Sequence, residues 1–148
     1  MTTLISTVPT IKAAYEQWSV SLPAIKNVPG LVWGLVLEPL PPVFYARNAK
    51  YNALGLADRS EPLVITLVSA TWSSATDDAL VTATANSLLD AVKKAAGQLD
   101  GLDPYIYLNY AGQYQNPIDS YGAQSVSRLQ PCKGRSSRRF YIPSPWRV

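Results

Sequence analysis

The chain has 148 residues, of which 47% are hydrophobic and 16% charged, a composition typical of one folded globular domain. It contains no histidine and one cysteine, which excludes a Ser-His-Asp or Cys-His hydrolase, an internal disulfide and an ordinary zinc or copper site. The formal net charge is +3, yet residues 1–131 carry 8 basic and 10 acidic side chains, so the positive charge belongs to the C-terminal tail. A slightly acidic body lacks the clustered basic surface that nucleic acids require, and we predict no nucleic-acid partner.

No apolar run approaches the ~20 residues that cross a bilayer, so we also predict no membrane partner. The N-terminal sequence lacks the basic region and apolar block of a signal peptide. These features favour a cytoplasmic location, although a chain shortened at its N-terminus would have lost any such signal.

The first predicted element is a helix that covers about residues 11–22. Pro23 is expected to end or kink it, and the Pro-Gly pair at 29–30 is expected to form the turn that follows. The helical period of 3.6 residues places four apolar side chains on one stripe: Ile11, Tyr15, Trp18 and Leu22.

Two strands are predicted next. Residues 31–38 are rich in Val, Leu and Trp and are too short for a typical helix, and the prolines from Pro39 onwards are expected to close this strand. Residues 43–62 have a mixed composition and are expected to form a partly extended loop that crosses the sheet. Residues 63–72 predict the clearest strand because half of them are β-branched.

The clearest helix is predicted over residues 74–99. Ser74 is a good N-cap, and Asp77 and Asp78 lie in the first turn, where the helix dipole favours negative charge. Adjacent residues of a helix point about 100° apart, so we interpret this acidic pair as dipole compensation rather than as a catalytic pair. The predicted buried face consists of Val81, Ala85, Leu88, Leu89, Val92, Ala96 and Leu99.

Residues 105–110, YIYLNY, are predicted to form a short aromatic strand, followed by a polar loop and a short helix within 122–130. The period of two places Tyr105, Tyr107 and Asn109 on one side of this strand. Such a face could lie over a planar ligand and bond to it. The pattern alone fits better with structural tyrosines that are half-buried in a strand.

The whole pattern predicts an α+β fold: a small, mainly antiparallel sheet with helices packed on one face. We expect one domain over residues 1–130. Residues 131–148 are basic and rich in proline and serine, and they are expected to form a poorly ordered tail.

Several segments in order and spacing resemble one family. They are VPGLVW at 28–33, LEPLPP at 37–42, WSSATDD at 72–78, YLNYA at 107–111, QNPI at 115–118 and SYG at 120–122. The family comprises the fungal FAD-linked oxidoreductases of the berberine-bridge-like group, which carry a p-cresol methylhydroxylase-type FAD domain and are associated with secondary metabolism. The resemblance covers roughly residues 8–130 and corresponds to the C-terminal, substrate-covering region.

This resemblance implies a cofactor, FAD, that a separate N-terminal domain binds, often through a covalent histidine link. Substrate is oxidised between that domain and the sheet of the second one, with a tyrosine assisting proton removal. By position, Tyr107 is the expected catalytic residue, and Tyr105 and Tyr107 are the expected substrate-binding residues. Asn109 and Tyr110 are the expected cofactor contacts. A tyrosine with an ordinary pKa near 10 is a poor base at neutral pH, so this role requires its surroundings to lower its pKa.

The departures from the family pattern matter as much. The flavin-binding half is absent from this sequence, as is the histidine of the covalent link, and residues 131–135 read PCKGR where the family has a Tyr-Asp-Pro-x-Gly-Val-Phe-like close. That change resembles a frameshift, a retained intron or an alternative exon.

We therefore expect a truncated oxidoreductase-like chain without autonomous oxidase activity, which acts on a small-molecule substrate only together with a separate FAD-binding chain. The alternatives are a standalone metabolite-binding or flavin-independent module that uses the exposed aromatic face, and a chain that self-associates through that face.

Overall fold

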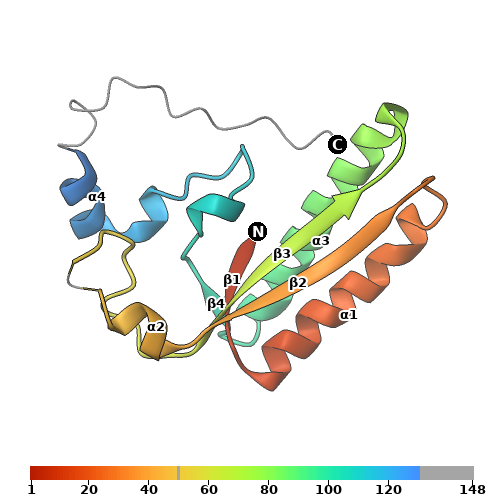
Figure 1. Cartoon of the computed structure of the whole chain (residues 1–148). Coiled ribbons are helices and arrows are strands. Elements are labelled where there is room, and N and C mark those ends of the chain that lie inside the picture. The colour runs from red at the N-terminus through yellow and green to blue at the C-terminus, as the bar shows by residue number, and fades with distance from the viewer. Residues whose placement is uncertain (50, 131–148) are drawn as a thin grey trace.

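The structure is a computed structural model that describes residues 1–49 and 51–130, so the prediction of a poorly ordered tail lies outside the described residues. The predicted α+β fold is confirmed (Figure 1). In chain order the elements are β1 (Thr2–Ile5), α1 (Val8–Ile25), β2 (Val32–Leu40), α2 (Pro42–Ala46), β3 (Leu63–Thr71), α3 (Asp78–Gly97), β4 (Leu102–Asp103) and α4 (Ala123–Leu129). Short 3-10 turns lie at Ala75–Asp77, Leu108–Tyr110 and Asp119–Tyr121.

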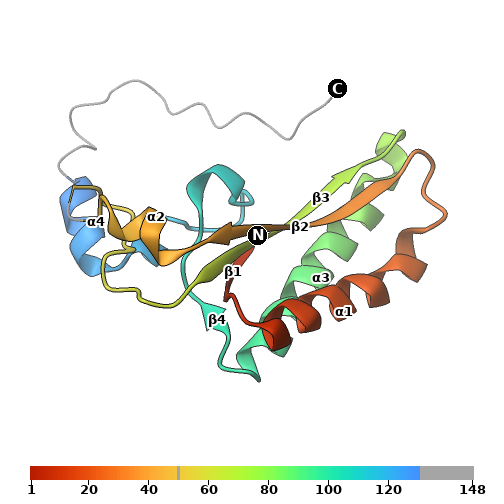
Figure 2. The ribbon, with the colours of Figure 1, turned by 60° about the horizontal axis from the view of Figure 1, so that its bottom comes forward.

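The sheet has four strands in the order β2-β3-β1-β4, and all three pairings are antiparallel. Helices α1 and α3 both cover one face of it, as predicted (Figure 2). The main core lies between them and the sheet and is built around Leu4, Val64, Leu88 and Val92. None of the described helices is long and apolar enough to span a bilayer.

Strand β1 was missed in the sequence, although it lies in the middle of the sheet. Thr2 pairs with Thr66 of β3, and Leu4 pairs with Leu102 of β4. Leu4 has no exposed surface. Four residues at a chain end give too few positions for a period of two to be recognised, so only the long-range pairing identifies this strand.

The expectation that Pro23 ends α1 is wrong, because the helix continues to Ile25. A proline inside a helix removes one main-chain hydrogen bond and crowds the preceding turn. The end of α1 is nevertheless held by packing: Ile25 is 1% exposed and contacts Val28 and Val81 in a third core cluster. At the other end, Thr7 and Thr10 bond to each other's main-chain nitrogens and cap the first turn.

The predicted strand at 31–38 is confirmed, but Pro39 does not close it, because β2 runs to Leu40. β2 lies at the edge of the sheet, where a residue without an N–H is tolerated on the unpaired side. Strand β3 and helix α3 match their predictions within a few residues. Leu99, however, was expected on the buried face of the helix, and it lies beyond α3 and is 47% exposed.

The segment expected as an extended loop begins instead with α2 and continues in turns. The hydroxyl of Tyr45 donates to the main-chain oxygen of Glu61 at 2.6 Å, which ties the start of the segment to its end. Tyr45 and Leu56 belong to a second core, which also contains Leu63, Tyr105 and Tyr121. The short helix predicted within 122–130 is confirmed as α4.

The predicted aromatic strand at 105–110 is wrong. Strand β4 stops at Asp103, and residues Leu108–Tyr110 form a 3-10 turn. Pro104 has no N–H to continue a ladder, and the next two main-chain nitrogens donate to side chains: Tyr105 to the Asp103 carboxylate at 2.8 Å, and Ile106 to the Ser120 hydroxyl at 2.9 Å. Side chains, rather than a neighbouring strand, therefore accept the hydrogen bonds of the Tyr105 and Ile106 N–H groups.

Candidate functional site

Three of the candidate residues meet at the turn Leu108–Tyr110. The hydroxyl of Tyr107 accepts a hydrogen bond from the Asn109 amide at 2.7 Å. The rings of Tyr107 and Tyr110 meet edge to face, with centroids 5.2 Å apart and planes at 86°. The turn is closed by the Tyr110 N–H, which donates to the main-chain oxygen of Tyr107 at 3.1 Å. We call Tyr107, Asn109 and Tyr110 the aromatic turn.

The aromatic turn keeps polar groups available at the surface. Asn109 is exposed, and Tyr107 and Tyr110 are half-buried. Tyr107 accepts from Asn109, so its own hydroxyl proton remains free to be donated to a ligand. The aromatic turn thus offers a ligand the hydroxyl donor of Tyr107 and the two rings of Tyr107 and Tyr110.

Glu38 is a member of the site that was missed in the sequence. It raises the pKa of Tyr110, first because the phenol donates a hydrogen bond to the carboxylate and second because ionisation would place two negative charges side by side. The neighbouring carboxylate therefore favours the protonated form of Tyr110. The available signal was the alternation of β2, which places Glu38 on the face opposite Trp33 and Leu37.

Tyr105 lies apart from the aromatic turn, in the second core. It is 2% exposed, and its ring stacks on Tyr121 with centroids 5.6 Å apart. Burial is the largest cause of its raised pKa, with Tyr121 and Tyr107 adding to it and Arg59 opposing it. The structure therefore joins Tyr107 to Asn109 and Tyr110 in the aromatic turn, while Tyr107 also packs against the second core that contains Tyr105.

A shielded ion pair between Arg59 and Asp103 lies just before Tyr105, where the chain leaves β4. The Arg59 Nε donates to both carboxylate oxygens of Asp103, at 2.8 and 3.1 Å, and the side chains are only 18% and 13% exposed. Arg59 also donates to the main-chain oxygen of Gly55 and lies 5.8 Å from the ring centre of Tyr105. Asp103 therefore links the end of β4, the turns of the 51–62 segment and the second core.

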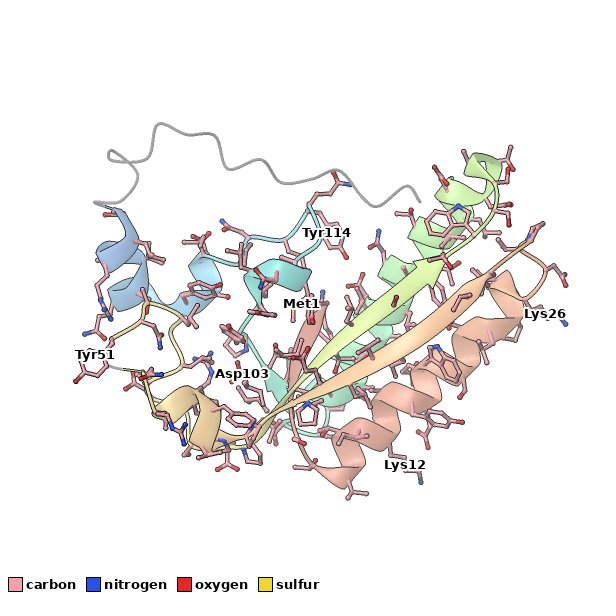
Figure 3. All side chains as sticks on the ribbon, in the orientation of Figure 1. Met1, Lys12, Lys26, Tyr51, Asp103 and Tyr114 are labelled. Carbon is pink, nitrogen blue, oxygen red and sulfur yellow. The ribbon has the colours of Figure 1, made fainter. Side chains whose placement is uncertain are left out.

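Two clefts adjoin the site. The larger, about 260 Å³, is lined by residues of β3 and α3 together with Met1, Tyr110 and Tyr114. Met1 and Tyr114 are labelled in Figure 3. The smaller, about 140 Å³, lies between Met1, Lys93 and Tyr105. Both are below the ~300 Å³ at which pockets for drug-sized ligands begin.

These dimensions do not fit a whole FAD. The described residues also offer no glycine-rich turn that leads into a helix N-terminus, which is the usual cradle for a pyrophosphate. No group of three or more potential ligands for a metal ion occurs among residues 1–49 and 51–130. The aromatic turn could supply one wall of a flavin site, and the dinucleotide would have to be held elsewhere.

Met1 lies at the junction of the two clefts and is clamped by Gln115. The amino group of Met1 donates to the Gln115 side-chain oxygen at 3.1 Å, and the Gln115 amide donates back to the Met1 main-chain oxygen at 2.9 Å. The same side-chain oxygen accepts from the Gly112 N–H at 3.0 Å. Burial, and to a smaller extent Lys93, lowers the pKa of the amino group to about 6.

This amine makes stability depend on pH in a chain whose Met1 is unblocked. The pKa falls from 8.0 in the unfolded chain to about 6 in the folded one, so the unfolded state binds more protons between these values. The stabilisation that the neutral Met1 amino group gives the folded state is complete above pH 8 and is lost as the pH falls through 6. After allowance for partial exposure, we expect the free energy of unfolding to be about 1 kcal/mol higher at pH 8 than at pH 6.

Urea unfolding at the two pH values measures this difference, and the absence of histidine removes the usual competing titration in the window. N-terminal acetylation is the matched control and should flatten the dependence. An equal slope in the acetylated chain would assign the effect to another group.

No family model and no solved structure matches the chain. Among curated proteins, it is 55% identical over 129 residues to the oligopeptidase PhomG' of Diaporthe leptostromiformis, a match that covers 86% of this chain and 11% of that protein. It is 39% identical over 79 residues to the FAD-dependent monooxygenase FUP4 of Fusarium proliferatum, covering 53% of this chain and 15% of the relative. It is 30% identical over 108 residues to the FAD-dependent monooxygenase drtC of Aspergillus calidoustus, covering 70% and 20% respectively.

The chain therefore spans no more than a fifth of the length of these relatives. Four of its matches are fungal FAD-dependent monooxygenases, so the sequence is similar to one segment of that kind of flavoprotein. This similarity supports a general resemblance to fungal FAD-linked oxidoreductases.

Proposed function

We propose that residues 1–130 are the substrate-covering part of a fungal FAD-linked oxidoreductase of the berberine-bridge-like group, without oxidase activity of their own. The observation that carries the proposal is the aromatic turn, which combines two tyrosine rings and an exposed amide on one surface. Similarity to a segment of several FAD-dependent monooxygenases supports it. In this proposal FAD is bound by a separate polypeptide segment or chain.

Within this proposal Tyr107 contacts the substrate and Asn109 faces the flavin. Asn109 already donates to the Tyr107 hydroxyl, which leaves the phenolic proton free for an acceptor on the substrate. Tyr110, whose pKa Glu38 raises, contributes its ring beside them. Tyr105 would act indirectly, by fixing the core on which Tyr107 packs.

The oligopeptidase name of the relative with 55% identity does not argue for peptidase chemistry in this chain. Peptide hydrolysis needs an activated nucleophile or a metal-bound water, and both commonly depend on histidine. This chain has none, and the match covers only 11% of that protein. We infer that the shared segment is not the part of the relative that would cleave peptides.

A segment exchange tests the proposed function. The matching part of the monooxygenase drtC is replaced by residues 1–130 of this chain, and flavin content is measured by visible absorbance. We expect the exchanged protein to retain flavin and the isolated chain to bind none. In the exchanged protein, Tyr107→Phe and Asn109→Ala should slow flavin reduction by at least tenfold, whereas Tyr51→Phe, a change at an 84% exposed ring, should leave it unchanged.

Stoichiometric flavin on the isolated chain would overturn the cofactor-free part of the proposal. Loss of flavin from the exchanged protein despite a folded spectrum would overturn the substrate-covering part.

A second candidate is a standalone module that binds a flat or hydrophobic metabolite without flavin. The cleft beside Tyr110 favours it, because apolar residues of β3 and α3 line it together with two tyrosines. Thermal-shift screening with aromatic ligands tests this candidate, and a cleft-filling Ala85→Phe variant should abolish any shift. Light scattering at high concentration tests the remaining alternative, self-association through the aromatic surface.

A further inference from the structure

Along one of its edges, strand β3 is paired with another strand over only about half of its length. Its pairing with β1 covers Leu63 to Thr66, and the last pair is Thr2 with Thr66. β3 itself continues to Thr71, and along its other edge it stays paired with β2 over this whole length. Beyond Thr66, no described residue pairs with the edge that β1 leaves free.

The main-chain groups that face this free edge can be identified from the ladder. Ser6 N donates to the Pro62 oxygen at 2.7 Å, so these residues form a hydrogen-bonded pair in line with the register of β1 and β3. Such pairs alternate along an antiparallel ladder, which makes Thr2 and Thr66 another. Two and four residues further on, Val68 and Ala70 must therefore direct their N–H and C=O groups to the free edge.

The 260 Å³ cleft lies along this edge, since Val68, Ala70 and Trp72 all line it. None of its lining residues carries a charged side chain. Helix α3 contributes an apolar wall that includes Val81, Ala85 and Leu89, and the segment after the aromatic turn contributes Tyr110 and Tyr114.

We propose that this edge binds an extended polypeptide segment, which enters the cleft as an added antiparallel strand in line with β1. Unpaired main-chain groups at a regular spacing are the template for strand addition. The site continues the existing β1–β3 ladder, and its uncharged walls suit an uncharged segment. The inference does not depend on a flavin.

The register specifies what the segment must look like. Continuing the pairing of Thr2 with Thr66 places the residue directly before Met1 opposite Val68 and the third residue before it opposite Ala70. Side chains directly opposite each other lie on the same face of a sheet. These two positions therefore face α3 and require apolar side chains, and the one position between them faces Tyr110 and Tyr114.

The clamp on Met1 is compatible with such a strand. Gln115 bonds to both the nitrogen and the oxygen of Met1, as the main chain of a neighbouring strand would. An amide nitrogen at Met1 could donate to the same Gln115 oxygen as the amino group does. Extending β1 therefore costs none of the hydrogen bonds that hold its first residue.

Hydrogen exchange on the full chain tests the proposal, with the sequence Thr-Val-Thr-Val placed directly before Met1 as the probe. In the unextended chain we expect the amides of Val68 and Ala70 to exchange quickly, and those of Leu67 and Ser69, paired with β2, to exchange slowly. The extension should slow Val68 and Ala70 by at least tenfold and leave Leu67 and Ser69 unchanged.

Val-Thr-Val-Thr is the matched control, because it has the same composition with its two faces exchanged, and it should protect less. Ala70→Pro removes an N–H on the free side of β3, and Ala85→Phe fills the cleft; each should abolish the protection of Val68. The proposal would be overturned by slow exchange of the Val68 and Ala70 amides in the unextended chain, or by equal protection from both extensions. It would also be overturned if light scattering showed a dimer in which these two amides no longer exchange quickly.

Discussion

Replacing Asp103 by alanine is expected to lower the free energy of unfolding by about 3 kcal/mol. The change leaves the Arg59 guanidinium largely shielded from water without its carboxylate, and it removes the acceptor of the Tyr105 N–H. Breaking a buried ion pair on one side typically costs about 3–5 kcal/mol, and the partial exposure of this pair places it near the lower end. Urea or thermal unfolding measures the loss.

The control for this prediction is Asp90→Ala, because Asp90 also pairs with a cation but is 76% exposed. Its effect should stay within about 0.5 kcal/mol. The double variant Arg59→Met/Asp103→Ala should be less destabilised than the sum of the two single variants, since neither charge is then left alone. Additive losses would mean that the two side chains contribute independently and would contradict the pairing.

Replacing Gly55 by alanine is expected to cost about 2–4 kcal/mol of stability. Gly55 has φ +73°, where a side chain alone costs ~1–2 kcal/mol. The new Cβ would also overlap the main-chain oxygen of Tyr121, a rigid group that can move only with the second core. The loss should therefore exceed that of an ordinary glycine substitution.

Gly97→Ala is the matched control for that change. Gly97 is the last residue of α3, and no heavy atom lies within 4 Å of the added Cβ. Alanine favours a helix over glycine by up to ~1 kcal/mol, so this variant should be as stable as the parent or more so. Equal losses from the two substitutions would show that Gly55 does not pack against Tyr121 as described.

The parts of the fold that could be predicted are those whose signal is local. Helix α3 was recognised because a long apolar period, Ser74 before it and Asp78 in its first turn all agree. Strand β3 was recognised from its β-branched run. For α3 the buried face follows from sequence spacing alone, and the structure buries Leu88 and Val92 accordingly.

The parts that could not be predicted depend on residues far apart in the chain. Tyr105 looked like a strand residue, but its N–H is held by Asp103, and the next N–H is held by Ser120, 14 residues later in the chain. Tyr107 and Asn109 do lie together, although a turn rather than strand alternation joins them. The influence of Glu38 on Tyr110 spans about half of the chain, and no local pattern predicts it.

The central position of β1 has a consequence for how the chain folds during synthesis. Strand β1 is synthesised before its partners β3 and β4, whose paired residues follow about 60 and 100 positions later. Contacts of such long sequence separation form slowly because a large loop must close first. Until Leu102 has been made, Leu4 lacks a neighbour on one side, and the nascent chain exposes an apolar segment that chaperones would recognise. The sheet is therefore completed only when nearly all of residues 1–103 have been translated.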